Sequence, residues 1–285
     1  MAKRFILNAD DFGMSRAYNR AVLDGFEHGL LKSASLVANG KSYDEAVDIV
    51  LPYCEGLGVG IHLNIIEGRS LCTDLTQLTD ANGMFNNSYL QLILKAYGKS
   101  KKEFLEQVER EFRVQIEKVM AKTKITHIDS HVHTHAIPPI FELVCKLAKE
   151  YGINQVRTQY EKTYFIPDYG KILSIKYPVN LVKVALLNYF TSKNKKKIIK
   201  YNLKTNDYLL GVTYTSMMDA LSVAYGLSAI NNKNNITVEA LIHPCRYDDG
   251  IIDNHFVEYK ITKNKKLKSK IELLGYEITN YAEEV

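Results

Sequence analysis

The sequence lacks the marks of secreted, membrane-spanning and thiolate-metal proteins. Its 285 residues include four cysteines, and no two of them form a C-x-x-C pair, so we expect neither a disulfide framework nor a cysteine zinc site. No apolar run reaches the length of about 18 residues that spans a bilayer. No signal peptide opens the chain, because residues 1–4 lead directly into a short strand-like run. We therefore expect a cytoplasmic protein with no membrane partner.

The chain also lacks the motifs of nucleotide-binding and nucleic-acid-binding proteins. No Gly-x-Gly-x-x-Gly follows a strand-like run, and there is no Walker loop. The formal charge is only +5, from 37 basic and 32 acidic residues, and we expect the lysine-rich patches at 193–200 and 260–270 to be solvated. A mild positive charge without a recognisable module predicts no nucleic-acid partner.

Strand-like and helix-like patterns alternate along most of the chain. We expect strands at 3–9, 33–38, 58–63, 124–130, 154–158, 208–214, 238–242 and 276–281. We expect helices at 15–29, 42–53, 138–152 and 269–275, and a long amphipathic helix after Ser100. Capping boxes, in which a Ser is followed three residues later by Glu, indicate the helix starts at Ser42 and Ser100.

This alternation predicts an α/β fold with parallel strands. A (β/α) barrel, complete or distorted, fits it better than a doubly wound open sheet. No linker divides the chain, so we expect one domain over residues 1–285. Residues 67–99 show little pattern, and a loop of that length is expected to cover a site. Residues 160–208 hold helical pieces and much polar loop.

Titratable residues follow four of the strand-like runs. In a parallel β/α architecture the carboxyl ends of the strands meet on one face, where sites are built. A single histidine is most often a structural residue, but independent core histidines have no reason to share this placement. The residues that share it are Asp10, Asp11, His62, His131, His133 and His243.

One Asp with two His is a familiar ligand set for a divalent cation with open positions. If the extended chain continues past residue 130, His131, His133 and His135 lie on one face. Asp129 is a candidate partner that fixes an imidazole tautomer. Arg157 ends a strand-like run and is a candidate to orient Asp10 or to bind substrate.

Four segments resemble signature motifs of the YdjC-like carbohydrate deacetylases: residues 8–13 (NADDFG), 60–63 (GIHL), 126–135 (THIDSHVHTH) and 242–244 (IHP). The resemblance implies a distorted (β/α) barrel related to the polysaccharide deacetylase fold. It implies a metal held by Asp11, His62 and His131, with Asp10 as the catalytic base. His243 corresponds in position to a histidine general acid of related deacetylases.

The function that the resemblance implies is metal-dependent hydrolysis of an acetamide on a small carbohydrate such as a chitooligosaccharide. A bound divalent ion, Mg or Zn, would activate the water. Members of the family often form dimers, so a homodimer stays open beside a monomer. Two alternatives also stay open: a metallophosphoesterase or amidohydrolase barrel, and a non-catalytic sugar- or metal-binding protein. A group of aromatic residues either stacks on the sugar or consists of ordinary core and surface aromatics: Tyr160, Tyr164, Phe165 and Tyr169.

Overall fold

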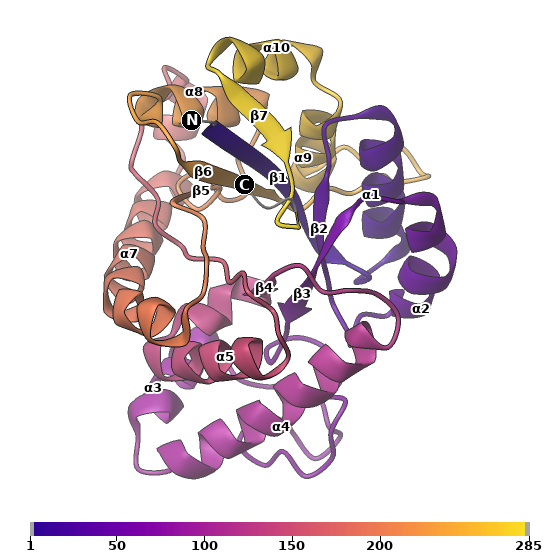
Figure 1. Cartoon of the computed structure of the whole chain (residues 1–285), viewed down its shortest axis with the longest axis vertical. Coiled ribbons are helices and arrows are strands. Elements are labelled where there is room, and N and C mark those ends of the chain that lie inside the picture. The colour runs from indigo at the N-terminus through magenta and orange to yellow at the C-terminus, as the bar shows by residue number, and fades with distance from the viewer. Residues whose placement is uncertain (1–2, 283–285) are drawn as a thin grey trace.

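The computed structural model describes residues 3–282, and its centre is a parallel β-sheet curled into half a barrel with helices around it (Figure 1). The strands run in the order β4-β3-β2-β1-β6-β5, and β7 pairs with β1. They are β1 (Lys3–Phe12), β2 (Ser33–Leu36), β3 (Gly58–Leu63), β4 (Ile128–Ser130), β5 (Tyr208–Leu210), β6 (Thr237–Ile242) and β7 (Tyr276–Thr279). The predicted α/β barrel class is confirmed.

Strand β1 is the centre of the sheet. Strand β6 pairs with one of its edges, and the other edge is shared by β7 and β2. All of these pairings are parallel, so the carboxyl ends of the strands lie on one face of the half-barrel.

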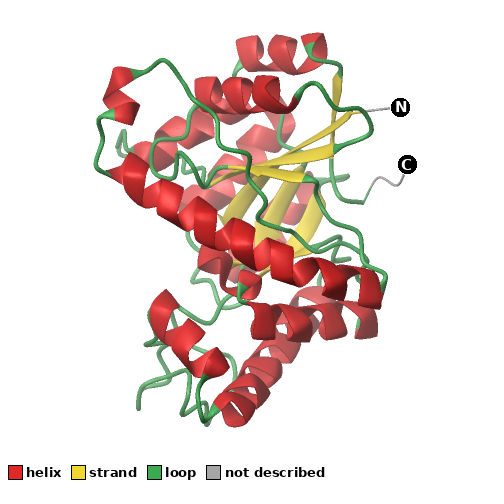
Figure 2. Cartoon of the chain, turned by 90° about the vertical axis from the view of Figure 1, so that its left-hand side faces the viewer, coloured by secondary structure: helices red, strands yellow, loops and turns green. Residues whose placement is uncertain are grey.

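Helices cover the outside of the sheet, as Figure 2 shows. The α-helices are α1 (Arg16–His28), α2 (Tyr43–Glu45), α3 (Tyr89–Tyr97), α4 (Lys101–Met120), α5 (Pro138–Glu150), α6 (Tyr169–Ile172), α7 (Lys176–Tyr201), α8 (Ala220–Ile230), α9 (Asn254–Thr262) and α10 (Lys265–Leu273). Shorter turns are a π-helical segment, η1 (Ala46–Val50), and two 3₁₀ segments, η2 (Leu51–Tyr53) and η3 (His131–Ala136). Within residues 3–282, no helix is both long enough and apolar enough to cross a bilayer.

The long amphipathic helix forms as predicted. Its apolar positions recur every three or four residues, so they share one face, and that face is buried against the sheet and α5. Burying each such side chain stabilises the fold by about 1.5–3 kcal/mol. The buried apolar residues of α4 are Phe104, Val108, Phe112, Ile116 and Val119.

The predicted strand at 154–158 is wrong. Only isolated bridges join Val156 to Ile128 and Gln155 to Lys204. The backbone N–H of Thr158 donates to the Asn206 side chain at 2.7 Å, so a side chain replaces the next bond of the ladder. This segment still connects β4 to residues 204–209, and it carries Arg157 into the barrel.

Both predicted capping boxes are also wrong. The Ser42 and Ser100 hydroxyls make no cap hydrogen bond, because neither residue has the extended backbone that aims a cap at the helix. Glu45 instead accepts a hydrogen bond from Asn19. The capping box that does form is Ser88 with Gln91, and it opens α3 inside the segment expected to be loop.

Candidate active site

The carboxyl end of β1 contains a β-bulge that positions two neighbouring aspartates. The pairing register with β2 shifts between Ala9 and Phe12, and Asp11 has a left-handed backbone with φ 64°. In a regular strand adjacent side chains point to opposite faces, whereas a bulge re-aims one of them. Both Asp10 and Asp11 consequently line the same cavity.

Asp10 is buried against a guanidinium. Its Oδ2 accepts from Arg157 Nη1 at 2.7 Å, and its Oδ1 accepts from Arg157 Nη2 at 2.6 Å and from Asn8 Nδ2 at 2.7 Å. Burial alone would raise the pKa of Asp10, but Arg157 outweighs it and lowers the pKa. The carboxylate is therefore ionised and fixed in orientation.

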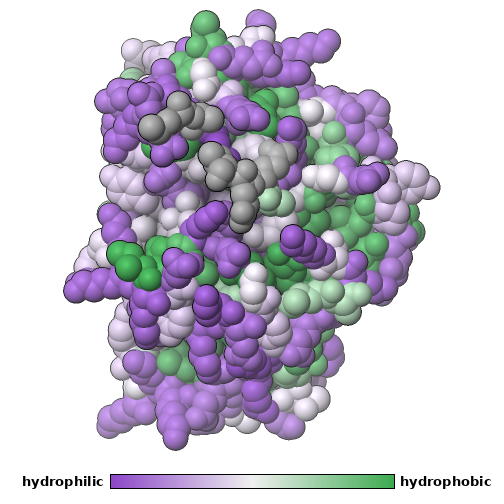
Figure 3. All heavy atoms as spheres, in the orientation of Figure 1, coloured by the Kyte–Doolittle hydropathy of each residue, from purple (hydrophilic) through white to green (hydrophobic). Residues whose placement is uncertain are grey.

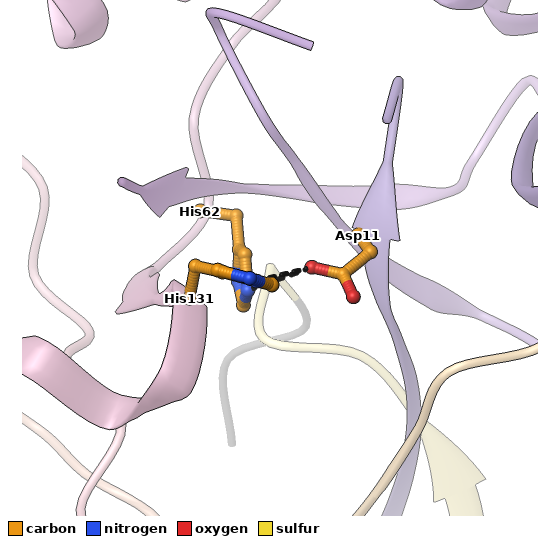
Figure 4. Close-up of side chains that lie close together, drawn as sticks. All are labelled: Asp11, His62 and His131. Atoms are coloured by element: carbon orange, nitrogen blue, oxygen red, sulfur yellow. Dashed lines mark hydrogen bonds and ion pairs between the residues drawn. The ribbon is translucent and has the colours of Figure 1, made fainter. Parts of the chain in front are cut away.

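Asp11 faces two imidazoles instead. Its Oδ1 lies 2.8 Å from His131 Nδ1 and 3.4 Å from His62 Nε2. Figure 4 shows both rings directed at this one carboxylate. Burial works against ionisation, yet hydrogen bonds from His131 and His62 hold the pKa of Asp11 well below its ordinary value. Three ligand-type atoms thus converge from β1, β3 and η3.

Each of these histidines meets a second carboxylate with its other ring nitrogen. His62 Nδ1 lies 2.7 Å from Asp129 Oδ1, and His131 Nε2 lies 3.2 Å from Glu67 Oε2. A carboxylate on the far nitrogen fixes the tautomer and orientation of a metal-binding imidazole. Burial opposes protonation of His62, but Asp129 and Asp10 raise its pKa to about 10. This pattern fits a divalent cation between Asp11, His62 and His131.

The extended conformation that would place His131, His133 and His135 on one face does not continue past Ser130. The segment turns into the 3₁₀ helix η3, and Val132 and His133 have left-handed φ values of 52° and 56°. His131, His133 and His135 consequently diverge. His135 is buried against Ser130 Oγ at 2.5 Å, whereas His133 lines the cavity. The buried His133 Nδ1 has no hydrogen-bond partner among residues 3–282, and burial lowers the pKa of His133 to about 3.

His243 reaches the cavity from the end of β6. Its Nδ1 lies 3.3 Å from Glu258 Oε2, and its backbone N–H donates to the same oxygen at 2.5 Å. Burial opposes protonation, but the Glu258 carboxylate raises the pKa of His243 to about 9. The imidazole is therefore held as a cation at neutral pH.

The cavity has a volume of about 750 Å³. Its floor contains Asp10, Asp11, His131, His133 and His243, and helix α7 contributes Lys183 and Leu186 to its wall. The aromatic residues considered for sugar stacking are not part of its lining. Thus the polar candidates meet at one place, and the aromatic candidates do not.

Sequence reasoning missed three glutamates around the site. Glu239 lies inside β6 and accepts from Arg157 Nε at 2.8 Å, and burial raises the pKa of Glu239 to about 7. Glu239 could have been found from the sequence, because it is a charged residue within the apolar run of β6. Glu67 follows the end of β3, as the other site residues follow theirs. Glu258 lies on α9, where no pattern predicted an element.

Comparisons with known proteins show the family to which the chain belongs. A family model described as YdjC-like protein matches residues 4–273. A carbohydrate deacetylase of Clostridium beijerinckii is 38% identical over 151 residues, which is 53% of this chain and 58% of that protein. Carbohydrate deacetylase 1 of Listeria innocua is 33% identical over 218 residues, which is 76% of this chain and 82% of that protein.

The fold also has a counterpart among solved structures. A crystal structure from Enterococcus faecalis V583, of a protein named for cellobiose-phosphate cleavage, matches with a TM-score of 0.72. The match covers 99% of this chain and 98% of that chain at 20% sequence identity, so it establishes the fold alone.

Proposed function

Because the chain belongs to the YdjC-like protein family, we propose that it is a metal-dependent deacetylase of N-acetylated carbohydrates. The observation that supports the proposal is that the two adjacent carboxylates have different partners. Asp10 is bound by Arg157, and Asp11 is bound by His62 and His131. A pure binding site would need no spare carboxylate beside its ligand.

Asp11, His62 and His131 would hold the metal. Their donor set of one carboxylate and two imidazoles suits zinc and other divalent ions, magnesium included. When bound, such a cation polarises a carbonyl oxygen and lowers the pKa of a water molecule. Asp129 and Glu67 would keep the two rings in the tautomers that leave one nitrogen free for the cation.

Asp10 would act as the general base. It is ionised, lines the cavity and is oriented by Arg157, so it can take a proton from water as that water attacks the acetamide carbonyl. Protonated His243 would act as the general acid and deliver a proton to the departing amine. The products are acetate and the free amine. Acid–base help of this kind typically contributes about 10²–10⁴-fold to the rate.

The proposed substrate class is a small carbohydrate such as a chitooligosaccharide. The names of the Clostridium and Listeria relatives support a carbohydrate, and a cavity of about 750 Å³ has the size of an ordinary small-ligand site. His133 lines this cavity and is our candidate for a hydrogen bond to the substrate.

Acetate release from diacetylchitobiose, with and without chelator, tests the proposal. We expect chelator-sensitive release by the wild type. Asp10→Asn should retain bound metal and lose turnover, whereas His62→Ala should lose both. Metal content by elemental analysis separates the two variants. Full activity of Asp10→Asn would refute the base assignment, and phosphate release from a generic ester without acetate release would refute the reaction class.

A further inference from the structure

An apolar stripe runs along the outer face of α7. Its positions alternate in steps of four and three residues, which places them on one side of the helix. The stripe is exposed at its start and its middle, since Ile175 is 84% exposed and Val182 is 71% exposed. In Figure 2, α7 lies at the front of the molecule. The stripe consists of Ile175, Val179, Val182, Leu186 and Tyr189.

The apolar surface continues onto neighbouring elements. Leu173 follows α6 and is 81% exposed, and Tyr169 at the start of α6 is 80% exposed. Helix α3 presents Leu90, Leu94 and Tyr97 on its outer face. Helices α3 and α7 both border the cavity, through Tyr89 and Leu186. Figure 3 shows hydrophobic residues at the left edge of the molecule, where α7 lies in Figure 1.

Helix α7 adds only positive charge to this surface, and two lysines of the surface pair with acids of neighbouring elements, Lys200 with Glu142 and Lys171 with Asp219. Between residues 169 and 201 the chain contains eight lysines and no aspartate or glutamate. The steps of three and four that define the stripe continue to Lys193, Lys196 and Lys200, so the outer face of α7 changes from apolar to basic. Lys183 stands beside the stripe and is exposed. A single exposed leucine is ordinary, but an apolar stripe extended by lysines is not.

We infer that the outer face of α6, α7 and α3 docks on an anionic membrane surface. Exposed apolar and aromatic side chains that enter the headgroup region, together with lysines near lipid phosphates, are how peripheral helices bind a bilayer. A second copy of the chain is a poorer partner for this face, because α7 contains no aspartate or glutamate and would offer the lysines of the other copy's α7 no acidic partner. This inference departs from the expectation of no membrane partner, which rested on the absence of a spanning segment, because this surface would lie on the bilayer rather than across it.

The docking surface borders the cavity. Lys183 and Leu186 belong to α7 and line the cavity wall, and Tyr89 at the start of α3 lines it as well. A bilayer on this face would therefore lie beside the cavity mouth. The inference does not depend on the proposed reaction, because it uses only the outer surface of these helices.

Sedimentation with lipid vesicles tests the inference. The full chain is mixed with vesicles of phosphatidylcholine alone, or of about three parts phosphatidylcholine to one part phosphatidylglycerol. We expect binding to the second kind only, and release by high salt because the lysine contribution is screened. The double variant Ile175→Glu, Val182→Glu should bind at least about tenfold more weakly, since each lost apolar side chain is worth roughly that factor.

Leu273→Glu is the matched control. Leu273 is 80% exposed and ends the lysine-rich helix α10, so it tests the same substitution on a basic surface without the stripe. The control should bind like the wild type, and equal melting temperatures exclude misfolding as the cause of any loss. Absence of vesicle binding by the wild type would overturn the inference. So would a dimer in light scattering that the double variant dissociates while vesicle binding is absent.

Discussion

The pairing of Glu258 with His243 makes a quantitative prediction about pH. Glu258→Gln removes the carboxylate charge but keeps an oxygen that can accept from the His243 backbone N–H. The local geometry should therefore survive. The carboxylate raises the pKa of His243 from its ordinary 6.5 to about 9 against the opposing effect of burial. Without that charge, only the weaker effects of Asp11 and Asp10 still oppose burial, and the pKa should fall toward its ordinary value.

The size of the effect follows from the proposed role of His243 as general acid. The wild type keeps the acid protonated up to about pH 9, so the alkaline limb of kcat/KM should lie near that pH. In Glu258→Gln that limb should move toward pH 6.5, and kcat/KM at pH 8 should fall by up to about 30-fold, the value for a pKa of 6.5, while activity near pH 5.5 changes little. The assay is acetate release from diacetylchitobiose between pH 5 and 10.

Two comparisons make this test decisive. Glu272→Gln neutralises a glutamate on the distant helix α10 and should leave the profile unchanged. An alkaline limb of Glu258→Gln that coincides with the wild-type limb would refute the role of His243 as the acid controlled by this carboxylate.

The pairing of Glu258 with His243 also predicts a change of stability with pH. A raised folded-state pKa stabilises the fold fully below pH 6.5, and this contribution is lost as the pH rises through about 9.

Three further substitutions test other contacts. Glu67→Gln should weaken metal binding by about 10–100-fold, measured by competition with a chelator, because His131 loses its outer carboxylate; unchanged affinity would contradict that role. Gly60→Ala should lower the free energy of unfolding by about 1–3 kcal/mol in urea, because a Cβ there would lie 2.4 Å from the His127 ring; a neutral effect would show that the ring can move. Arg157→Gln should cost about 3–5 kcal/mol by the same measurement, because it leaves buried carboxylates unpaired, and a smaller loss would mean that Asp10 or Glu239 takes up a proton instead.

The strand framework could be predicted from local sequence because most strands are apolar runs, and four of these runs have titratable residues at one end. The Asp10-Asp11 pair, His62, His131 and His243 were all found in this way, and parallel pairing alone brings them to one face. The bulge that turns Asp11 into the cavity could not be predicted from the sequence. It depends on the left-handed backbone of Asp11, and an Asp-Asp pair occurs both in strands with a bulge and in strands without one.

Side-chain contacts that cross the barrel could not be predicted from the sequence. Glu258 and Glu67 reach the site from α9 and from a loop, where hydrophobic periodicity carries no information. The strand expected around Arg157 failed because side chains of Thr158 and Asn206 satisfy backbone groups that a ladder would use. Alternation likewise suggested that His131, His133 and His135 share a face, but left-handed backbone at Val132 and His133 ended the extended chain.

The contacts of Arg157 have a consequence for how the chain folds. The guanidinium pairs with Asp10 on β1, Asp129 on β4 and Glu239 on β6, which are separated by more than a hundred residues along the chain. Closing loops of that length costs entropy before any pairing repays it. A carboxylate whose strand packs into the barrel before Arg157 arrives would be desolvated without its cation, which is strongly unfavourable. A barrel assembled from one side only should therefore be unstable, and the last strands should join in a single cooperative step.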